Sequence, residues 1–543
     1  MENLKAQIDF DAPPLKNVLP ILLRGLNIDN LNNVKPRALK SDAEKFLRTR
    51  SNAEVFTPSR VVKFMVDALD DGQIDSRWLE ITCGEAPFIT NRYDAETGEL
   101  IPFDNRAGIL DKKLRAIHSN ADKFTWAFRA VQSVYGYELQ ADSLLIARAN
   151  ILLTFTEFVG FCSDAELAEV AAVIAQNFWQ TDALKIKPAQ ISLFDDAIDW
   201  NTGDEIFLGG SNMKKFDFVI GNPPYQEETD NESTRMLPVY HKFMEAAYKV
   251  GEKVELITPA RFLSNAGDTP KDFNRRMLND PNLKVLDYAQ DASKYFKGVY
   301  IEGGVAITLR DETKNFGEIG TFIPFAELET IHQKVCIDNP NFRPLNEIIY
   351  PRAIYRFVKD NSFVDTNAFE KMSDYFFDAK PADGDDYIQI FGLMKNQRAY
   401  KWIRRADVTN HETLGKYKVF VSQANGASGK LGNEPARIIS KPVVGEPLIG
   451  NTATFTVIGA FDTRAEAEAC LSYIKSKFAR AMLGILKVTQ HNPPATWAKV
   501  PLQEFTTASD IDWSGDVDAQ LYRKYGLDDV EIKFIETHVK AMD

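Results

Sequence analysis

The segment KFDFVIGNPPYQEE, residues 215–228, joins an apolar run to an abrupt turn. The run has the composition of a buried strand. Pro223 and Pro224 end that strand, because proline lacks the N–H that a ladder needs and fixes φ at about −65°. The sequence therefore predicts a buried strand whose tip carries an amide, Asn222, and an aromatic ring, Tyr225.

Strand and helix patterns alternate around this segment. Apolar residues at helical spacing in FTPSRVVKFMVDAL (56–69) predict a helix with Thr57 as its N-cap. Buried strands are predicted in five further segments: RWLEITCGEAPF (77–88), VYGYELQADSLL (134–145), KVELITPARFL (253–263), LKVLDYAQDA (283–292) and GGVAITL (303–309). Such alternation is typical of an α/β fold, a Rossmann-like and mostly parallel sheet with helices on both faces.

The chain divides by its patterns into four parts. We expect a helical arm or partner surface in residues 1–50 and the α/β domain in residues 51–315. We expect a second, mixed α/β domain in residues 316–504 and a helical tail in residues 505–543. The tail contains two short amphipathic patterns separated near Gly526, and Asp528 is the predicted N-cap of the second helix.

A basic segment lies in the second domain of an otherwise acidic chain. The formal net charge of −13 argues, as an average, against a nucleic-acid partner. Residues 394–446 nevertheless combine basic side chains with aromatic ones, which favours a local DNA-facing surface over a merely solvated face. The candidate DNA contacts are Lys395, Arg398, Lys401, Trp402, Arg404, Arg405 and Lys430.

Composition limits the compartment and the chemistry. No window of about 18 apolar residues is present, so the sequence predicts no membrane span. The first 20 residues lack the apolar region of a secretory signal, and the four cysteines form no close pair. The six histidines have no spacing typical of a metal site. We expect a cytoplasmic protein without a metal site.

The predicted strand tip suits one kind of chemistry. Asn222 does not titrate near neutral pH, so it can offer a carbonyl acceptor and amide donors but not a base. The main-chain carbonyl of Pro223 is a second acceptor, and Tyr225 offers a ring on which a planar base can stack. Two acceptors can bind both hydrogens of an exocyclic amine and leave its lone pair free to attack an activated methyl group. A base in this position must have left the double helix.

The GNPPY sequence after an apolar strand resembles motif IV of the DNA adenine-N6 methyltransferases of bacterial restriction–modification systems. The order of segments is similar to their γ arrangement, in which a target-recognition domain follows the catalytic domain. The resemblance implies a methyltransferase sheet in residues 51–315, S-adenosylmethionine as methyl donor and double-stranded DNA as substrate. It implies catalytic roles for Asn222, Pro223, Pro224 and Tyr225, and residues 316–504 as the target-recognition domain. YFKGVYIEGGV (295–305) resembles motif VIII, in which Phe296, or else Tyr295, covers the other face of the base.

The same resemblance implies a set of cofactor-binding residues. They are Phe56, Thr57 and Pro58 (motif X), Glu80, Cys83, Gly84 and Phe88 (motif I), Glu138 (motif II) and Asp182 (motif III). A carboxylate such as Glu138 at a strand end suits the two ribose hydroxyls, which are both donors. Asp182 could bind the cofactor's adenine amine or simply cap the following turn. Ala86 stands where the motif I pattern has a second glycine, which predicts a tighter approach of the cofactor.

These residues predict a sequence-specific DNA methyltransferase acting on adenine N6, as part of a restriction–modification system. A separate restriction endonuclease is then a candidate partner. Two alternatives stay open: a bifunctional restriction endonuclease–methylase, and a DNA-binding specificity subunit with an inactive methylase fold. Methylation of cytosine N4, RNA or protein uses the same chemistry, and only the resemblance favours adenine. A second Asn-Pro-Pro sequence at 492–494 lacks the aromatic residue and is predicted to be a plain turn.

Overall fold

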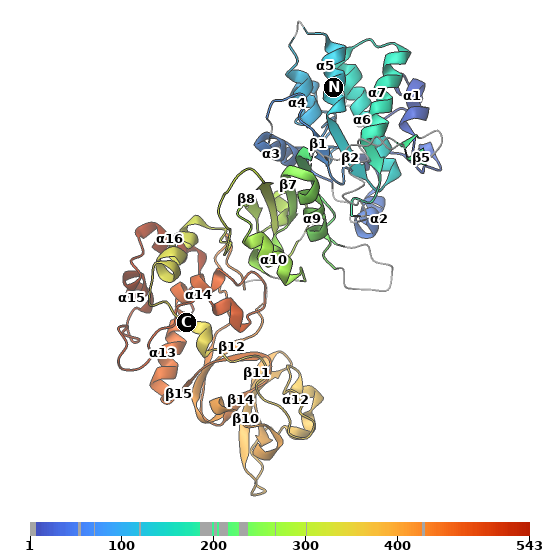
Figure 1. The fold of residues 1–543 in the computed structure, drawn as a ribbon. Helices are drawn as coiled ribbons and strands as arrows, with labels where there is room; N and C mark the ends of the chain where they lie inside the picture. The colour runs from blue at the N-terminus through green and yellow to red at the C-terminus, as the bar shows by residue number, and fades with distance from the viewer. Residues whose placement is uncertain are drawn as a thin grey trace. The chain divides into compact units, whose positions relative to one another are not determined.

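The computed structural model describes residues 7–52, 56–69, 71–118, 121–184, 198–199, 204–205, 215–226, 237–265, 268–299, 301–425 and 429–542. The chain divides into two compact units, Met1–Thr321 and Phe322–Asp543 (Figure 1). Among the described residues, no helix is both long enough and apolar enough to cross a membrane.

The first unit is built on a seven-stranded sheet with the order β3-β2-β1-β6-β7-β9-β8. Its strands are β1 (Trp78–Glu80), β2 (Val134–Glu138), β3 (Phe178–Gln180), β6 (Phe216–Gly221), β7 (Gly251–Pro259), β8 (Leu283–Ala289) and β9 (Val305–Asp311). Within the row β3-β2-β1-β6-β7, each strand is parallel to the next. Strand β9 is antiparallel to both β7 and β8. This mostly parallel sheet confirms the predicted Rossmann-like fold class.

The helices of the first unit are α1 (Leu15–Leu22), α2 (Asp42–Asn52), α3 (Ser59–Leu69), α4 (Ile109–Arg115), α5 (Lys123–Gln132), α6 (Ala141–Val159), α7 (Asp164–Asn177), α9 (Tyr240–Val250) and α10 (Lys271–Leu278). Helices α6 and α7 pack against β2 and β3, and α9 packs against β6 and β7 (Figure 1). All three residues of β1 are buried, which is expected of a central strand whose two faces are both covered. A separate pair, β4 (Ile198–Asp199) and β5 (Asp204–Glu205), is antiparallel.

The N-terminal arm packs against the first unit, where α1 contacts α6 and α7. The fully buried guanidinium of Arg148, on α6, donates to the carbonyls of Leu22 at 2.7 Å and Arg24 at 2.8 Å, just at the end of α1. It also donates to the carbonyl of Phe178 at the start of β3. One side chain therefore satisfies otherwise unpaired carbonyls at a helix end and ties the arm to the sheet.

The second unit contains two three-stranded sheets with the orders β11-β10-β14 and β13-β12-β15. Its strands are β10 (Tyr387–Met394), β11 (Gln397–Arg404), β12 (Tyr417–Ser422), β13 (Val443–Gly445), β14 (Ile449–Asn451) and β15 (Phe455–Phe461). Its helices are α11 (Ala326–His332), α12 (Ala368–Lys371), α13 (Arg464–Lys475), α14 (Lys477–Gly484), α15 (Val517–Lys524) and α16 (Asp529–His538). This mixture confirms the predicted mixed α/β class. Asp528 forms the predicted N-cap, in a capping box with Glu531.

Candidate active site

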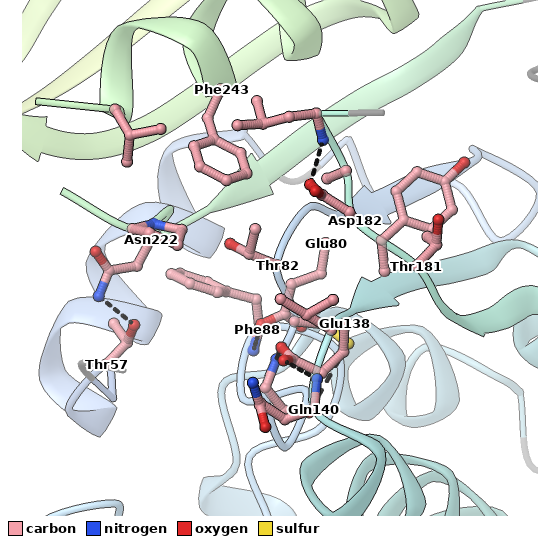
Figure 2. Close-up of a pocket in the computed structure, with 18 of the residues that line it drawn as sticks. Thr57, Glu80, Thr82, Phe88, Glu138, Gln140, Thr181, Asp182, Asn222 and Phe243 are labelled. Carbon is pink, nitrogen blue, oxygen red and sulfur yellow. Dashed lines mark hydrogen bonds between the residues drawn. The ribbon is translucent and has the colours of Figure 1, made fainter. Parts of the chain in front are cut away.

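A cavity of about 400 Å³ lies at the carboxyl ends of the parallel strands β1, β2, β3 and β6 (Figure 2). In a parallel sheet these ends meet at one edge, where ligands of α/β proteins bind. The lining residues are Phe56, Thr57, Glu80, Thr82, Cys83, Gly84, Pro87, Phe88, Tyr137, Glu138, Leu139, Gln140, Thr181, Asp182, Ala183, Leu184, Asn222, Pro224, Gln226, Val239, Lys242 and Phe243. The fold therefore brings together the predicted cofactor residues and part of the predicted catalytic tip.

Pro58 is the predicted cofactor residue that does not line this cavity. It is buried, and its carbonyl accepts from the N–H groups of Val61 at 2.9 Å and Val62 at 3.1 Å. These bonds begin α3. Pro58 thus fixes the start of the helix, and the preceding Phe56 and Thr57 are the residues that reach the cavity.

The loop after β1 has an unusual backbone. Thr82, Gly84 and Ala86 all have positive φ angles, of 58°, 55° and 59°. Left-handed conformations suit glycine, whereas an L side chain there is strained. A Cβ on Gly84 would meet the ring of Phe56 at 3.6 Å, an ordinary contact, so conformation rather than space accounts for glycine there. Ala86 is fully buried and packs in the core of the first unit, outside the cavity lining.

Two carboxylates hold this loop against the strands. Glu138 Oε2 accepts from the Gly84 N–H at 2.7 Å, and its Oε1 accepts from the Gln140 N–H at 2.8 Å (Figure 2). Glu80, which is 2% exposed, accepts from the N–H groups of Phe88 at 3.4 Å and Ile89 at 3.1 Å. Burial raises the pKa of Glu80 well above its ordinary value, despite those two bonds. The acids at the ends of β1 and β2 therefore shape the cavity as well as line it.

Cys83 belongs to the same loop and is buried. Its N–H donates to the carbonyl of Tyr137 at 2.7 Å, which joins the loop to β2. Burial raises the pKa of the Cys83 thiol, and the carboxylates of Glu80 and Glu138 raise it further. A neutral thiol is a poor nucleophile, so Cys83 serves the packing and shape of the loop.

Asp182 follows β3 and lines the cavity. Its Oδ1 accepts from the N–H of Leu184 at 3.0 Å (Figure 2). This bond makes the turn cap that the sequence left open as one alternative. Because Asp182 also lines the cavity, the cap and a ligand contact are compatible.

Asn222 lies at the tip of β6 and lines the cavity with Pro224. Its side-chain Nδ2 donates to the hydroxyl oxygen of Thr57 at 3.3 Å (Figure 2). Thr57 is 3% exposed, so its position is fixed by packing. Because the amide has a donor end and an acceptor end, anchoring the nitrogen orients the carbonyl oxygen. Pro223 is buried behind the tip.

The two predicted stacking residues contact each other. The ring of Tyr225 meets that of Phe296 edge to face, with centroids 6.4 Å apart and an interplanar angle of 71°. Phe296 is 3% exposed and belongs to the core of the unit, as does Tyr295 at 4%. Burial raises the pKa of the Tyr225 hydroxyl. Stacking on a base would therefore require Tyr225 to turn away from Phe296.

The predicted DNA contacts cluster around the β10–β11 hairpin of the second unit, but several bind protein groups. Lys401 pairs with Asp378, and Arg404 pairs with Asp383 at 3.1 Å and with Asp385 at 3.0 Å. Four other candidate residues also contact protein groups. Arg398 donates to the carbonyl of Lys441, and Arg405 donates to Asn410. The Lys395 N–H donates to Glu370, and the backbone of Trp402 bonds to the backbone of Phe377. Lys430 is half-buried. Nearby acids thus offset part of the positive charge that the sequence places here.

Sequence reasoning missed the wall of the cavity that α9 supplies. Phe243 and Lys242 line the cavity, and Figure 2 shows the Phe243 ring facing it from above Asn222. The apolar pattern of α9 predicts that Phe243 is buried, but periodicity does not show which buried residue borders a cavity. Leu139 also lines the cavity and is 48% exposed. The second Asn-Pro-Pro sequence leads into a short 3-10 helix, Pro494–Trp497, of which its last proline is the first residue.

Within the described part of the chain, no group of three or more histidine, cysteine or acidic side chains could hold a metal ion. The site is thus built from carboxylates, amides and aromatic rings. Carboxylates at the ends of β1 and β2 and the acid after β3 border one side of the cavity, and the amide of Asn222 borders another.

Several solved structures are similar to this chain. A nuclease-deletion mutant of the Type ISP restriction-modification enzyme LlaGI in complex with a DNA substrate mimic matches at 12% identity and a TM-score of 0.41, over 92% of this chain and 48% of that chain. A DrdV–DNA complex matches at 11% identity and a TM-score of 0.39, over 86% and 59%. The Type I restriction enzyme EcoKI M protein matches at 13% identity and a TM-score of 0.28, over 49% and 46%. This chain thus spans about half the length of these three structures.

No curated protein sequence matches the chain. Residues 132–296 match one family model, described as Eco57I restriction-modification methylase. The matched region runs from the start of β2 to Phe296 and includes Glu138, Asp182 and the Asn222–Tyr225 tip. The chain therefore resembles the restriction–modification methylases, and this match supports a DNA methyltransferase.

Proposed function

We propose that this protein is a sequence-specific DNA methyltransferase that transfers a methyl group from S-adenosylmethionine to N6 of a flipped-out adenine. The observation that carries the proposal is the shared cavity. Glu138 and Asp182, suited to a nucleoside, and Asn222, suited to an amine, line the same space at the carboxyl ends of parallel strands of one sheet.

The donor set of the cavity fits S-adenosylmethionine. The carboxylate of Glu138 can accept from the ribose hydroxyls while it keeps its two backbone bonds, since each oxygen has a further lone pair. Asp182 can accept from the adenine amine, and Phe243 and Leu139 offer apolar surface to the purine ring. A volume of about 400 Å³ lies within the usual range for small-molecule sites.

When bound, S-adenosylmethionine supplies an electrophilic methyl group on a sulfonium. In the proposed mechanism, the Asn222 side-chain carbonyl and the Pro223 main-chain carbonyl accept the two hydrogens of the target amine. These bonds would localise the nitrogen lone pair for direct attack on the methyl carbon. The carbon–sulfur bond would break as the carbon–nitrogen bond forms, the thioether would leave with the bonding pair, and one amine hydrogen would be lost to solvent as a proton. Thr57 accepts from the amide nitrogen and thereby orients the carbonyl end of the side chain. Tyr225 turns from Phe296 to stack on the extruded base, a contact that contributes about 1–3 kcal/mol.

On the basis of this proposed reaction, each part of the chain is given a role. We propose that residues 51–315 are the catalytic domain, with the arm of residues 1–50 before it, and that residues 316–504 recognise the DNA target, followed by the tail 505–543. Arg398, Arg405, Lys395, Lys401, Trp402, Arg404 and Lys430 are the candidate DNA contacts. Because Lys401 and Arg404 have acidic partners, their phosphate contacts require those ion pairs to open.

The test is transfer of labelled methyl groups to DNA, with nucleoside analysis of the product by mass spectrometry. Wild-type protein should form N6-methyladenine. Asn222→Ala should bind S-adenosylmethionine with unchanged affinity and lose about 100-fold or more in transfer rate, as expected when one preorganised polar contact to the reacting group is removed. Product appearing as N4-methylcytosine would refute the adenine assignment alone. Equal rates for Asn222→Ala and wild type would refute the mechanism.

Two other readings are separated by simple measurements. Magnesium-dependent cutting of unmodified DNA by the purified chain would show a bifunctional endonuclease–methylase, whereas we propose that cutting needs a separate endonuclease. A specificity subunit with an inactive methylase fold would show no binding of S-adenosylmethionine by calorimetry. We expect binding, because the carboxylates and the apolar walls of the cavity are all in place.

A further inference from the structure

The N-terminal arm contacts the segment that follows β2. The Lys40 ammonium donates to Asp142 Oδ2 at 2.8 Å, and the Arg48 guanidinium binds both Asp142 oxygens, at 2.8 and 3.0 Å. The side chains of Lys40, Arg48 and Asp142 are only 3%, 18% and 22% exposed. Burial opposes the charge on Asp142, yet hydrogen bonds from Arg48 and Lys40 lower its pKa, so the carboxylate is ionised. Asp142 lies in the first turn of α6, directly after Glu138 and Gln140 of the cavity wall.

The arm also contacts the loop after β1. The Arg37 N–H donates to Glu85 Oε1 at 2.6 Å, next to Gly84 of the cavity wall. The other oxygen of Glu85 accepts from the buried Tyr93 hydroxyl at 2.6 Å, which fixes the carboxylate. The Arg37 guanidinium lies over the ring of Phe56, 5.1 Å from its centroid, and Phe56 lines the cavity. The arm therefore contacts both the loop after β1, through Glu85, and the cavity-lining ring of Phe56.

A third contact reaches the end of β3. The Asn27 N–H donates to the side-chain oxygen of Gln180 at 3.1 Å. Gln180 is the last residue of β3 and precedes Thr181 and Asp182, which line the cavity. The arm thus contacts Glu85 after β1, Asp142 after β2 and Gln180 at the end of β3, each close in sequence to a carboxylate that lines the cavity. We call these arm residues (Asn27, Arg37, Lys40 and Arg48) and their partners (Gln180, Glu85 and Asp142) the arm clamp.

We propose that the arm clamp positions the three cofactor-binding loops, so that Lys40, Arg48 and Asp142 act as positioning residues for S-adenosylmethionine. This inference rests on the proposed function, because it takes the cavity as the cofactor site. None of the three residues lines the cavity, so their effect on affinity has to pass through Glu138, Gln140 and the start of α6. The arm is then a part of the binding site rather than a free partner surface.

The same helix provides a matched control. Glu157, near the end of α6, accepts hydrogen bonds from Arg92 at 2.8 Å and from Arg106 at 3.1 Å. Like Asp142, it is a carboxylate of α6 that binds two cationic side chains, and the two arginines are 15% and 4% exposed. Glu157, Arg92 and Arg106 do not line the cavity. Glu157→Gln therefore removes a comparable ion-pair cluster without touching the arm.

The experiment compares Asp142→Asn, Glu157→Gln and wild type in the full chain. Calorimetric titration with S-adenosylmethionine should show a Kd raised about tenfold in Asp142→Asn, a typical size for coupling between a site and a remote contact, and an unchanged Kd in Glu157→Gln. Both variants should lower the Tm by similar amounts. Because coupling is reciprocal, saturating S-adenosylmethionine should raise the Tm of Asp142→Asn less than that of wild type. Arg48→Gln, in which Lys40 still binds Asp142, should show a smaller rise in Kd.

Equal Kd values for wild type, Asp142→Asn and Arg48→Gln would overturn the inference and leave the proposed function intact. A similar loss of affinity in Asp142→Asn and Glu157→Gln would also overturn it, because general destabilisation of α6 would then explain both. Wild-type protein that binds no S-adenosylmethionine would overturn the cofactor assignment and this inference together.

Discussion

Replacing Ala86 by glycine tests whether the loop after β1 is strained by its alanine. Ala86 has a φ of 59°, a conformation in which an L side chain costs about 1–2 kcal/mol. Its methyl group is fully buried in the core of the first unit. Glycine should relieve the backbone strain, but the chain loses the burial of one methyl group and gains freedom in the unfolded state.

The opposing contributions have similar sizes. Loss of a buried methyl group costs about 0.8 kcal/mol, and the extra flexibility of glycine in the unfolded chain costs about 0.4–1 kcal/mol. We therefore expect Ala86→Gly to change the free energy of unfolding by less than about 1 kcal/mol. Ala149→Gly is the control, because Ala149 is equally buried but lies inside α6. There no strain is relieved, and we expect a loss of about 2 kcal/mol from helix propensity and packing together.

The assay is urea unfolding followed by circular dichroism, with and without S-adenosylmethionine. The transition that the cofactor shifts belongs to the unit that holds the cavity, so the two units are distinguished. Calorimetry should also show an unchanged Kd for Ala86→Gly, since the methyl group lies outside the cavity lining. A loss from Ala86→Gly as large as that from Ala149→Gly would refute the strain argument. A tighter Kd would show that the alanine obstructs the cofactor, as the sequence predicts.

Three further substitutions test single contacts. Thr57→Val removes the acceptor for Asn222 Nδ2 and should lower the transfer rate at saturating cofactor by about two- to tenfold, the size of one hydrogen bond, while Thr57→Ser should retain the rate. Tyr225→Phe should keep full activity and stability, because its buried hydroxyl has no hydrogen-bond partner in the described part of the chain; Tyr225→Ala should lose transfer. Glu255, on β7, is fully buried without a hydrogen bond to the described residues, and burial raises its pKa well above 4.5. The carboxyl group of Glu255 thus binds its proton more tightly in the folded state than in the unfolded state. The stabilisation that this proton provides is complete below pH 4.5 and is lost as the pH rises. The stability gained by Glu255→Gln in urea titrations should therefore grow with pH above that value, and a constant difference between pH 5 and 8 would contradict this.

The carboxyl ends of the strands were predictable from the sequence. Glu138 and Asn222 each end an apolar run, and parallel neighbours bring such ends to one edge. Pro58 was predicted to bind the cofactor, but it lies directly before the first residue of α3 and outside the cavity lining, whereas its neighbours Phe56 and Thr57 line the cavity. Local patterns alone do not separate these two positions.

Other features depend on contacts between distant residues. The charge of Arg404 and Lys401 suggests an open basic strand, but acids from a separate segment, residues 378–385, pair with both. Tyr225 appears in the sequence as a free stacking platform, yet its ring packs edge to face with Phe296, a ring 71 positions later in the chain. The arm clamp joins residues 27–48 to three loops as far away as residue 180. The periodicity of apolar residues indicates which side chains are buried but not which distant residues they contact.

The placement of β1 has a consequence for how the chain folds. This three-residue strand occupies the centre of the sheet, where Trp78 pairs with Val134 on one side and with Phe218 on the other. To form these pairs, the chain must close long loops between residues 78 and 134 and between residues 78 and 218. Closing a long loop costs entropy before any contact compensates, and folding rates fall as contacting residues lie further apart in sequence. During synthesis, the stacked rings of Trp78 and Phe218 cannot meet until β6 has left the ribosome. Until then the nascent chain exposes an unpaired apolar strand edge, and we expect chaperone dependence to be greatest at that stage.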